Sequence, residues 1–266
     1  MKHVRAPLSG FETVPIIEDA LARTNPDYRP RPPRRFPVRF LRYWFMRHAL
    51  ESLHRRLGRP LNVLEVGIGH GNMLAFMGGT ALDAQTYALP AMIARWDAVS
   101  GGANPATLSR YSYSSFQQVD LDQPFELANG DYDAIIALHV LEHLRAPEQT
   151  MSWLLPALRR DGVLMGGSPT MPNPLGRVHE IYLRRKFADK MHDIRIHKHL
   201  SVISPGRMRR FARSNGLHID LLSGAFLVRA SRSPLENKPW WIRMNLAWGA
   251  LFPALGGEVY FALRKS

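Results

Sequence analysis

The chain has 266 residues, 45% of them hydrophobic, which is enough for one large domain with a buried core. It contains no cysteine, so disulfides, thiolate metal sites and a cysteine nucleophile are excluded. This composition fits a reducing compartment. The first ten residues carry no apolar stretch of signal-peptide length, so we expect a cytoplasmic protein.

The net charge of +13 is unevenly distributed along the chain. Residues 1–60 carry 13 Lys/Arg against 5 Asp/Glu, and residues 183–213 carry 10 against 2. The intervening residues 61–182 are acidic, with 6 against 12. Basic flanks attract phosphate-rich partners, either nucleic acid or anionic lipid headgroups, although a general bias toward arginine would give the same numbers.

The N-terminal region is expected to be an extension of the main domain, ending near residue 60. The proline-rich run 25–35 should be extended, because proline removes a backbone donor and restrains its predecessor. Residues 38–57 show helical periodicity, with an apolar aromatic stripe surrounded by arginines, and Gly58 and Pro60 end the pattern. This helix could bind a membrane surface or nucleic acid, but packing against the following domain is the commoner outcome.

From residue 61 onward, strand-like and helix-like segments alternate. Such alternation predicts a parallel sheet covered by helices on both faces, with ligands bound at the carboxyl ends of the strands. A tryptophan-rich helix near the end is too short to span a membrane and contains Arg243. The predicted strands are 62–66, 85–89, 115–119, 132–138, 162–166, 217–222 and 258–263. One helix is predicted directly after Gly71, and a second includes Met92, Ile93 and Trp96. Three further helices are predicted over 148–159, 204–214 and 240–252.

A glycine-rich turn follows the first predicted strand, in the sequence Glu65-Val-Gly-Ile-Gly-His-Gly71. Glycines allow positive φ and let the backbone approach a ligand closely. The G-x-G-x-G spacing differs from the dinucleotide fingerprint and from a Walker A loop. The carboxylate of Glu65 would repel phosphate but suits a cationic ligand.

Together with later segments, this turn resembles class I S-adenosylmethionine-dependent methyltransferases, in particular the ubiquinone-biosynthesis-like group. The resemblance covers nearly all of residues 61–215. It implies a Rossmann-like, mostly parallel seven-stranded sheet and S-adenosylmethionine as the cofactor. The segments that carry it are 65–71, 116–121, 131–144, 160–164, and His199-Leu200 with the helix that starts at Ser204.

The resemblance also implies roles for individual residues. Asp120 would accept a hydrogen bond from the adenine amino group, with Leu121 beside the ring. Leu138 and His139 would lie near the sulfonium. The expected cofactor-binding residues are Glu65, Gly67, Ile68, Gly69, Gly71, Tyr87, Asp120, Leu121, Leu138 and His139.

One position departs from the family pattern. An acidic residue usually ends the second strand and binds the ribose hydroxyls, but residues 85–90 contain no carboxylate. Asp83 is near but precedes the predicted strand. Either another group holds the ribose or cofactor binding is weakened.

Histidines supply the candidate bases. His139 and His143 flank Glu142, and either histidine could deprotonate an acceptor near neutral pH. Related methyltransferases can bind a divalent metal through Glu-x-x-Glu-His, and two histidines and a glutamate could do so here. In this group of methyltransferases the same segment is also common as the start of a helix that binds no metal. We therefore expect no metal here.

A second histidine cluster, at His192, His197 and His199, lies in a basic segment over residues 183–203. It either forms a lid over the substrate entrance or is a solvated loop. We expect residues 61–266 to form the methyltransferase domain, with residues 236–256 as a tryptophan-rich insertion before the last strand.

The preferred interpretation is a methyltransferase acting on a small, lipid-linked or saccharide-linked acceptor, in peripheral contact with the inner face of an anionic membrane. An RNA methyltransferase would also use the basic flanks, but no Asn-Pro-Pro-Tyr-like motif follows the fourth strand, so nucleic acid is the weaker alternative. A non-catalytic protein that keeps the fold is a further alternative, supported by the missing strand-two acid. The glycine spacing disfavours a dehydrogenase.

Overall fold

The structure is a computed structural model that describes residues 41–77, 89–103, 105–111, 113–172, 174–187, 199–227 and 234–266. The proline-rich run at 25–35, Asp83, Tyr87, His192 and His197 lie outside the described residues, so the predictions for them remain predictions.

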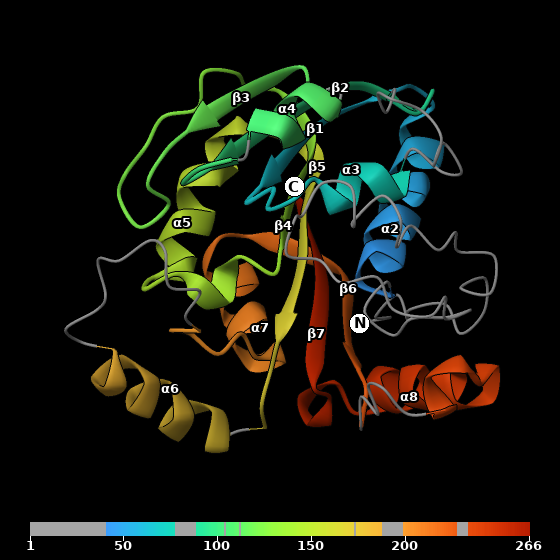
Figure 1. Cartoon of the computed structure of the whole chain (residues 1–266), viewed down its shortest axis with the longest axis vertical. Helices are drawn as coiled ribbons and strands as arrows, with labels where there is room; N and C mark the ends of the chain where they lie inside the picture. The colour runs from blue at the N-terminus through green and yellow to red at the C-terminus, as the bar shows by residue number, and fades with distance from the viewer. Residues whose placement is uncertain are drawn as a thin grey trace.

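A seven-stranded mixed sheet forms the centre of the molecule, with the strand order β3-β2-β1-β4-β5-β7-β6 (Figure 1). Pairing is parallel from β3 to β5, whereas β7 runs antiparallel to both β5 and β6. The predicted Rossmann-like, mostly parallel fold is therefore confirmed. The strands are β1 (Leu61–Val66), β2 (Ile93–Ser100), β3 (Ser115–Gln118), β4 (Tyr132–Leu138), β5 (Leu158–Pro169), β6 (Leu217–Ala225) and β7 (Glu258–Lys265).

The central strands are buried on both faces, as their sequences predict. In β4 every residue from Tyr132 to Ala137 is buried, and the apolar run needs no alternation because helices cover both sides. β1 is likewise buried except at Asn62. These two strands pair in register at the centre, so their carboxyl ends reach the same edge of the sheet.

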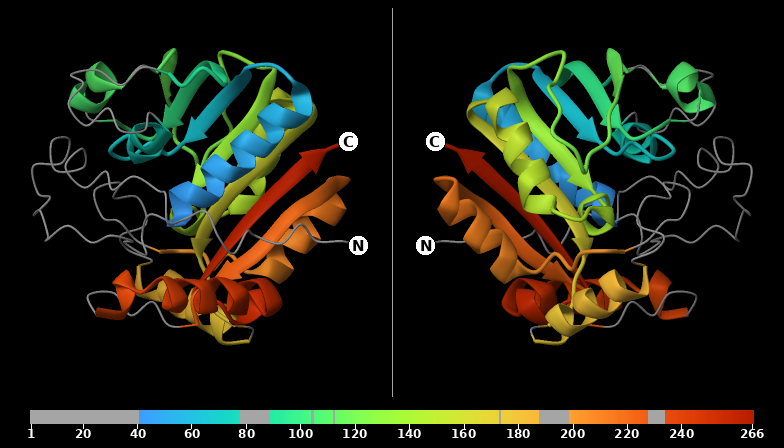
Figure 2. Two further views of the ribbon diagram at one scale, coloured as in Figure 1. Left: turned by 90° about the vertical axis from the view of Figure 1, so that its right-hand side faces the viewer. Right: turned by 90° about the vertical axis from the view of Figure 1, so that its left-hand side faces the viewer.

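The helices form one layer on each face of the sheet, and Figure 2 shows the two layers from opposite sides. Buried side chains of α2 and α3 pack with one face of β1, β4, β5 and β7, and those of α5 and α7 pack with the other face. The helices are α2 (Leu41–Leu57), α3 (Asn72–Met77), α4 (Pro105–Arg110), α5 (Pro147–Leu154), α6 (Leu175–Lys186), α7 (Pro205–Ser214) and α8 (Pro239–Leu251).

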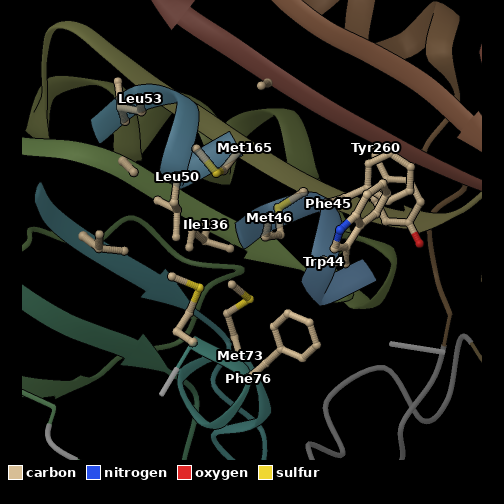
Figure 3. Close-up of a cluster of buried hydrophobic side chains, with 14 of the residues drawn as sticks. Trp44, Phe45, Met46, Leu50, Leu53, Met73, Phe76, Ile136, Met165 and Tyr260 are labelled. Atoms are coloured by element: carbon tan, nitrogen blue, oxygen red, sulfur yellow. The ribbon is translucent and has the colours of Figure 1, made fainter. Parts of the chain in front are cut away.

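Helix α2 is part of the core. Its buried residues include Trp44, Phe45 and Leu50, and they lie against strand residues such as Ile136 and Tyr260 (Figure 3). The Phe45 and Tyr260 rings stack with their centroids 4.3 Å apart. The apolar stripe of α2 therefore packs against the domain, which was the commoner of the outcomes expected for this helix.

The second strand was predicted in the wrong place. Residues 92–96 were expected to be helical, but Ile93 begins β2 and Trp96 lies within it. The charged residues Arg95 and Asp97 obscured the strand pattern. They form an ion pair of 3.2 Å, and the Tyr132 hydroxyl donates to Asp97 at 2.8 Å. Most of the strand predicted at 85–89 lies outside the described residues, and Leu89 is not in a strand.

The boundary between α5 and β5 was also predicted too late. The helix expected over 148–159 ends at Leu154, a short 3₁₀ turn follows at Leu155–Ala157, and β5 begins at Leu158. Pro156 removes a backbone donor at this point, which explains the early end. Helix α7 begins where predicted, because the Ser204 side chain accepts a hydrogen bond from Arg207 N at 3.2 Å.

Candidate active site

The glycine turn connects β1 to α3 at the carboxyl edge of the sheet. Gly67, Gly69 and Gly71 all have positive φ, at 73°, 52° and 71°. A Cβ on Gly67 would lie 2.6 Å from Val140, and one on Gly71 would lie 2.4 Å from the Tyr111 ring. Among the described residues, apart from its chain neighbours, none lies within 4 Å of a Cβ position on Gly69. Two of the glycines are thus required by packing, and the third leaves open backbone that a ligand can approach. Ile68 is buried between them.

Glu65, the penultimate residue of β1, is enclosed by aromatic residues. Its Oε2 accepts hydrogen bonds from Trp96 Nε1 at 3.0 Å and from the Tyr113 hydroxyl at 3.3 Å. Burial raises the pKa of Glu65 to about 7, although both hydrogen bonds act in the opposite direction. Neither aromatic residue was expected near Glu65. Its proposed contact with a cofactor remains a prediction.

The carboxyl end of β2 carries no acid either, although the strand differs from the predicted one. β2 ends at Ser100, whose hydroxyl donates to Gly102 O at 2.9 Å. The acid in β2, Asp97, is buried three positions earlier beneath Tyr132. The observed β2 thus ends in a serine, and how the cofactor ribose would be held remains a prediction.

Asp120 follows β3 and is exposed at the same edge of the sheet. Its Oδ1 accepts a hydrogen bond from Asp122 N at 3.0 Å, which fixes the turn. Leu121 is buried and belongs to the same hydrophobic cluster as Val66 and Val140. The position suits the predicted contact of Asp120 with an adenine amino group.

His139 follows β4, in a backbone conformation that is unusual for a residue with a side chain. Its φ is 54°, and its N–H donates to Gly167 O at 2.8 Å. Strained positions of this kind cluster at functional sites. The half-buried Leu138 precedes it.

The His139 side chain lies between two buried glutamates. Its Nδ1 is 3.1 Å from Glu142 Oε1, and its Nε2 is 3.9 Å from Glu258 Oε1. Burial would raise the pKa of Glu142, but the hydrogen bond and charge of His139 outweigh it, so the net pKa is lowered. Ser168 Oγ also donates to Glu142, at 2.9 Å. Together these groups form a buried polar cluster where β4 and β5 end.

Glu258 and Ser168 were not anticipated from the sequence. Glu258 begins β7, and its neighbours are the Tyr260 hydroxyl, which donates to it, and Arg42 Nη2 at 3.9 Å. Because β7 is antiparallel, its first residue lies beside the last residue of β5, at Pro169. Had the antiparallel pairing of the last strand with β5 been known, the sequence would have placed Glu258 at the carboxyl edge of the sheet.

His143 lies on the other side of Glu142. Its ring meets the His199 ring edge-on, with centroids 5.0 Å apart. Possible ligand atoms of Glu142, His143 and His199 lie within 4.8 Å of one another, so these three residues could hold a metal ion. Partial burial lowers the pKa of His199, and Glu142 opposes that effect. Of the second histidine cluster, His199 is thus brought to the site.

These residues fit S-adenosylmethionine. The open backbone at Gly69, the exposed carboxylate of Asp120 and the acidic surroundings of His139 all lie at the carboxyl edge of the sheet. Accessible backbone suits the methionine part, a carboxylate suits an adenine amino group, and acids suit a sulfonium cation.

The strand order and the glycine turn define a Rossmann-like methyltransferase fold. A family model described as a methyltransferase domain matches residues 39–222, and the chain belongs to that family. It is therefore a class I enzyme that uses S-adenosylmethionine, as its motifs predict. Membership of the ubiquinone-biosynthesis-like group remains a prediction.

Solved structures with a similar chain path have low sequence identity. The plantazolicin methyltransferase BpumL in complex with SAH is 15% identical, with a TM-score of 0.49 over 86% of this chain and 84% of that one. A putative sarcosine dimethylglycine methyltransferase from Galdieria sulphuraria is 15% identical, with a TM-score of 0.47 over 82% and 86%. The N-methyltransferase NodS from Bradyrhizobium japonicum WM9 is 14% identical, with a TM-score of 0.43 over 83% and 94%. No curated protein sequence matches the chain.

Proposed function

We propose that this methyltransferase acts on a small, lipid-linked or saccharide-linked acceptor that enters beside His139. The observation that carries the proposal is the placement of His139 between Glu142 and Glu258 at the carboxyl ends of β4 and β5. Parallel α/β sheets bind their ligands at this edge.

The cofactor would be held along the same edge. The backbone at Gly67, Gly69 and Gly71 would face its methionine part, Asp120 would accept from the adenine amino group, and Leu121 would support the ring from behind. When bound, S-adenosylmethionine supplies a methyl group on a positively charged sulfur. The strand-two position offers Ser100 for the ribose hydroxyls.

His139 is the proposed base. With Nδ1 3.1 Å from Glu142 Oε1, the other ring nitrogen, Nε2, would take the proton of an acceptor hydroxyl or amine. Nε2 is buried and faces Glu258 Oε1 at 3.9 Å, so the acceptor would have to enter between these two side chains. Removing that proton would leave a lone pair on the acceptor, facing the methyl group that the bound cofactor would supply. Glu142, whose pKa is lowered, stays ionised and stabilises the imidazolium that forms. His143 is the alternative base on the far side of Glu142.

The direct test measures cofactor binding and methyl transfer separately. Calorimetry with S-adenosylhomocysteine tests the cofactor site, and labelled S-adenosylmethionine with polar and lipid extracts tests the acceptor class. His139→Gln should lower transfer about 100-fold or more while product binding stays within a few-fold. The matched control is His218→Gln, because His218 lies on β6 and pairs with Asp220.

Three results would contradict part or all of the proposal. If neither S-adenosylmethionine nor S-adenosylhomocysteine gave binding heat, the non-catalytic alternative would be favoured. Methylation of RNA in place of any small or lipid-linked acceptor would favour the nucleic-acid alternative. Loss of activity in His143→Gln but not in His139→Gln would transfer the role of base to His143.

The proposal places the enzyme in the cytoplasm, at the inner face of the membrane when its acceptor is lipid-linked. Among the helices that the structure describes, none is both long and apolar enough to cross a bilayer.

A further inference from the structure

Exposed hydrophobic side chains gather in two segments of the chain. Within the described residues, every large hydrophobic side chain that is exposed lies in 171–182 or 227–255. Single exposed apolar residues are ordinary, but a contiguous set marks a surface that binds something. These residues are Met171, Leu175, Val178, Ile181, Tyr182, Leu227, Trp240, Met244, Leu251, Phe252 and Leu255.

Helix α6 presents a stripe of apolar and aromatic side chains to solvent. Leu175 and Val178 are each 63% exposed, Ile181 is 48% and Tyr182 is 54%. Their spacing of three and four residues places them on one face of the helix. The opposite face attaches α6 to the domain: Glu180 accepts from Val202 N and pairs with Arg207, both at 3.1 Å, and Leu183 is buried. These contacts fix the orientation of α6, so its apolar face points toward solvent.

Helix α8 is built in the same way. Ile242 and Leu246 are buried in the core cluster on the α2 side of the sheet. Trp240 at 56%, Met244 at 41% and Leu251 at 59% are exposed, at intervals of four and seven residues. One face of α8 packs on the domain, and the other presents apolar side chains, including a tryptophan.

The charges beside these stripes are positive. Arg177, Arg185 and Lys186 on α6 are exposed, as are Lys238 and Arg243 at α8. In the described part of the two helices, the sole acid is Glu180, which is already paired with Arg184 and Arg207. Within the described residues of α6 and α8, the surface thus combines apolar side chains with cations and has no exposed acid.

Both helices lie next to the carboxyl edge of the sheet, which carries the candidate active site. α6 follows the end of β5, and α8 precedes the start of β7, the same two strand ends that carry Ser168 and Glu258. Figures 1 and 2 show α6 and α8 at one end of the sheet, on the lower side of each view. An acceptor anchored in a membrane would meet the site from this end.

We propose that the exposed faces of α6 and α8 form a docking surface for an anionic lipid bilayer. Aliphatic and tryptophan side chains gain free energy by entering the interface, and the flanking cations pair with anionic headgroups. RNA would use the cations but not Leu175, Val178 or Ile181, which can neither stack on bases nor bind phosphate. A second copy of the chain would bring the same cations face to face. This inference deepens the proposed function, because it rests on an acceptor that resides in the membrane.

The test is flotation of the full chain with vesicles of phosphatidylcholine alone or mixed with phosphatidylglycerol, at low and high salt. We expect binding to the anionic vesicles and weaker binding at high salt. Val178→Asp combined with Ile181→Asp should weaken binding at least about tenfold, and Arg185→Glu combined with Lys186→Glu should do the same. The charge-matched control is Arg55→Glu with Arg160→Glu, since both arginines are exposed near the amino ends of the strands.

Circular dichroism and S-adenosylhomocysteine binding would show that each variant keeps its fold. Equal binding to neutral and anionic vesicles, equal loss in the control, or binding to single-stranded RNA but not to vesicles would overturn the docking surface. Concentration-dependent dimerisation abolished by the Val178 and Ile181 changes would also overturn it. Because vesicle binding needs no methyl transfer, its failure is distinguishable from failure of the enzymatic proposal.

Discussion

Glu65 is a carboxyl group held out of water between Trp96 and Tyr113. Its pKa is raised from 4.5 to about 7, mainly because burial disfavours the charged form. The folded protein therefore holds this proton more tightly than the unfolded chain does. The resulting contribution to stability is fully present below the unfolded pKa of 4.5 and is lost as the pH rises through about 7.

Glu65→Gln should remove this pH dependence, because the amide mimics the protonated acid and can still accept from Trp96. At about pH 8 the variant should be more stable than the wild type by about 3 kcal/mol, with little difference at about pH 4. Urea denaturation at both pH values measures the free energy of unfolding. Glu126→Gln, at an exposed position, serves as the control. Parallel pH profiles for wild type and Glu65→Gln would contradict the prediction.

Individual site residues were predictable where they belong to a local motif. The glycine turn, Asp120 and His139 each follow a strand directly, so their position at the carboxyl edge could be inferred from the chain alone. Glu258 and Ser168 could not be inferred in this way. Their approach to His139 depends on the antiparallel pairing of β5 with β7, a contact between distant parts of the sequence.

At the scale of elements, α6 is attached to the domain mainly through polar contacts, since Gly176 and Leu183 are its buried residues. Glu180 joins it to Arg207 and to Val202 N, and Arg184 donates to Arg145 O at 2.8 Å. Arg207 in turn binds Glu148, so α5, α6 and α7 are linked by one polar network.

Glu180→Ala should release α6 without unfolding the rest of the chain. Backbone amides of α6 should exchange faster with deuterium, while the free energy of global unfolding changes by about 1 kcal/mol or less, because Arg207 keeps Glu148. Hydrogen–deuterium exchange followed by mass spectrometry measures the first effect. Arg177→Ala, on the exposed side of the same helix, should leave exchange unchanged. Protection of α6 equal to the wild type would show that other contacts hold the helix.

The second strand shows why some elements were misplaced. Residues 93–100 alternate poorly, since Arg95 and Asp97 interrupt the apolar pattern. In the fold, Asp97 accepts from the Tyr132 hydroxyl, and Arg95 lies over the Tyr132 ring at 5.0 Å, so Tyr132 of β4 contacts both charged residues. A pattern of hydrophobic residues cannot reveal this compensation. In contrast, β4 was placed correctly because its apolar run needs no partner to be recognised.

At the scale of the whole molecule, helix α2 joins the family domain as part of a single core. Its side chains belong to the same buried cluster as residues of β1, β4, β5 and β7 (Figure 3). The family match begins at residue 39, just before α2. The sequence-based boundary at residue 60 therefore divides a region that packs together, and α2 should unfold together with the sheet.

Phe45→Ala tests this expectation. Phe45 is 1% exposed and stacks on Tyr260 in β7, so its truncation leaves a cavity between α2 and the sheet. The free energy of unfolding should fall by about 3–5 kcal/mol. Loss of helical circular dichroism and of tryptophan fluorescence should remain coincident in urea, as expected for one cooperative unit. Ser52→Ala, an exposed position on the same helix, should be nearly neutral. A small effect of Phe45→Ala, or separate transitions for the two signals, would mean that α2 is an appendage whose loss the sheet survives.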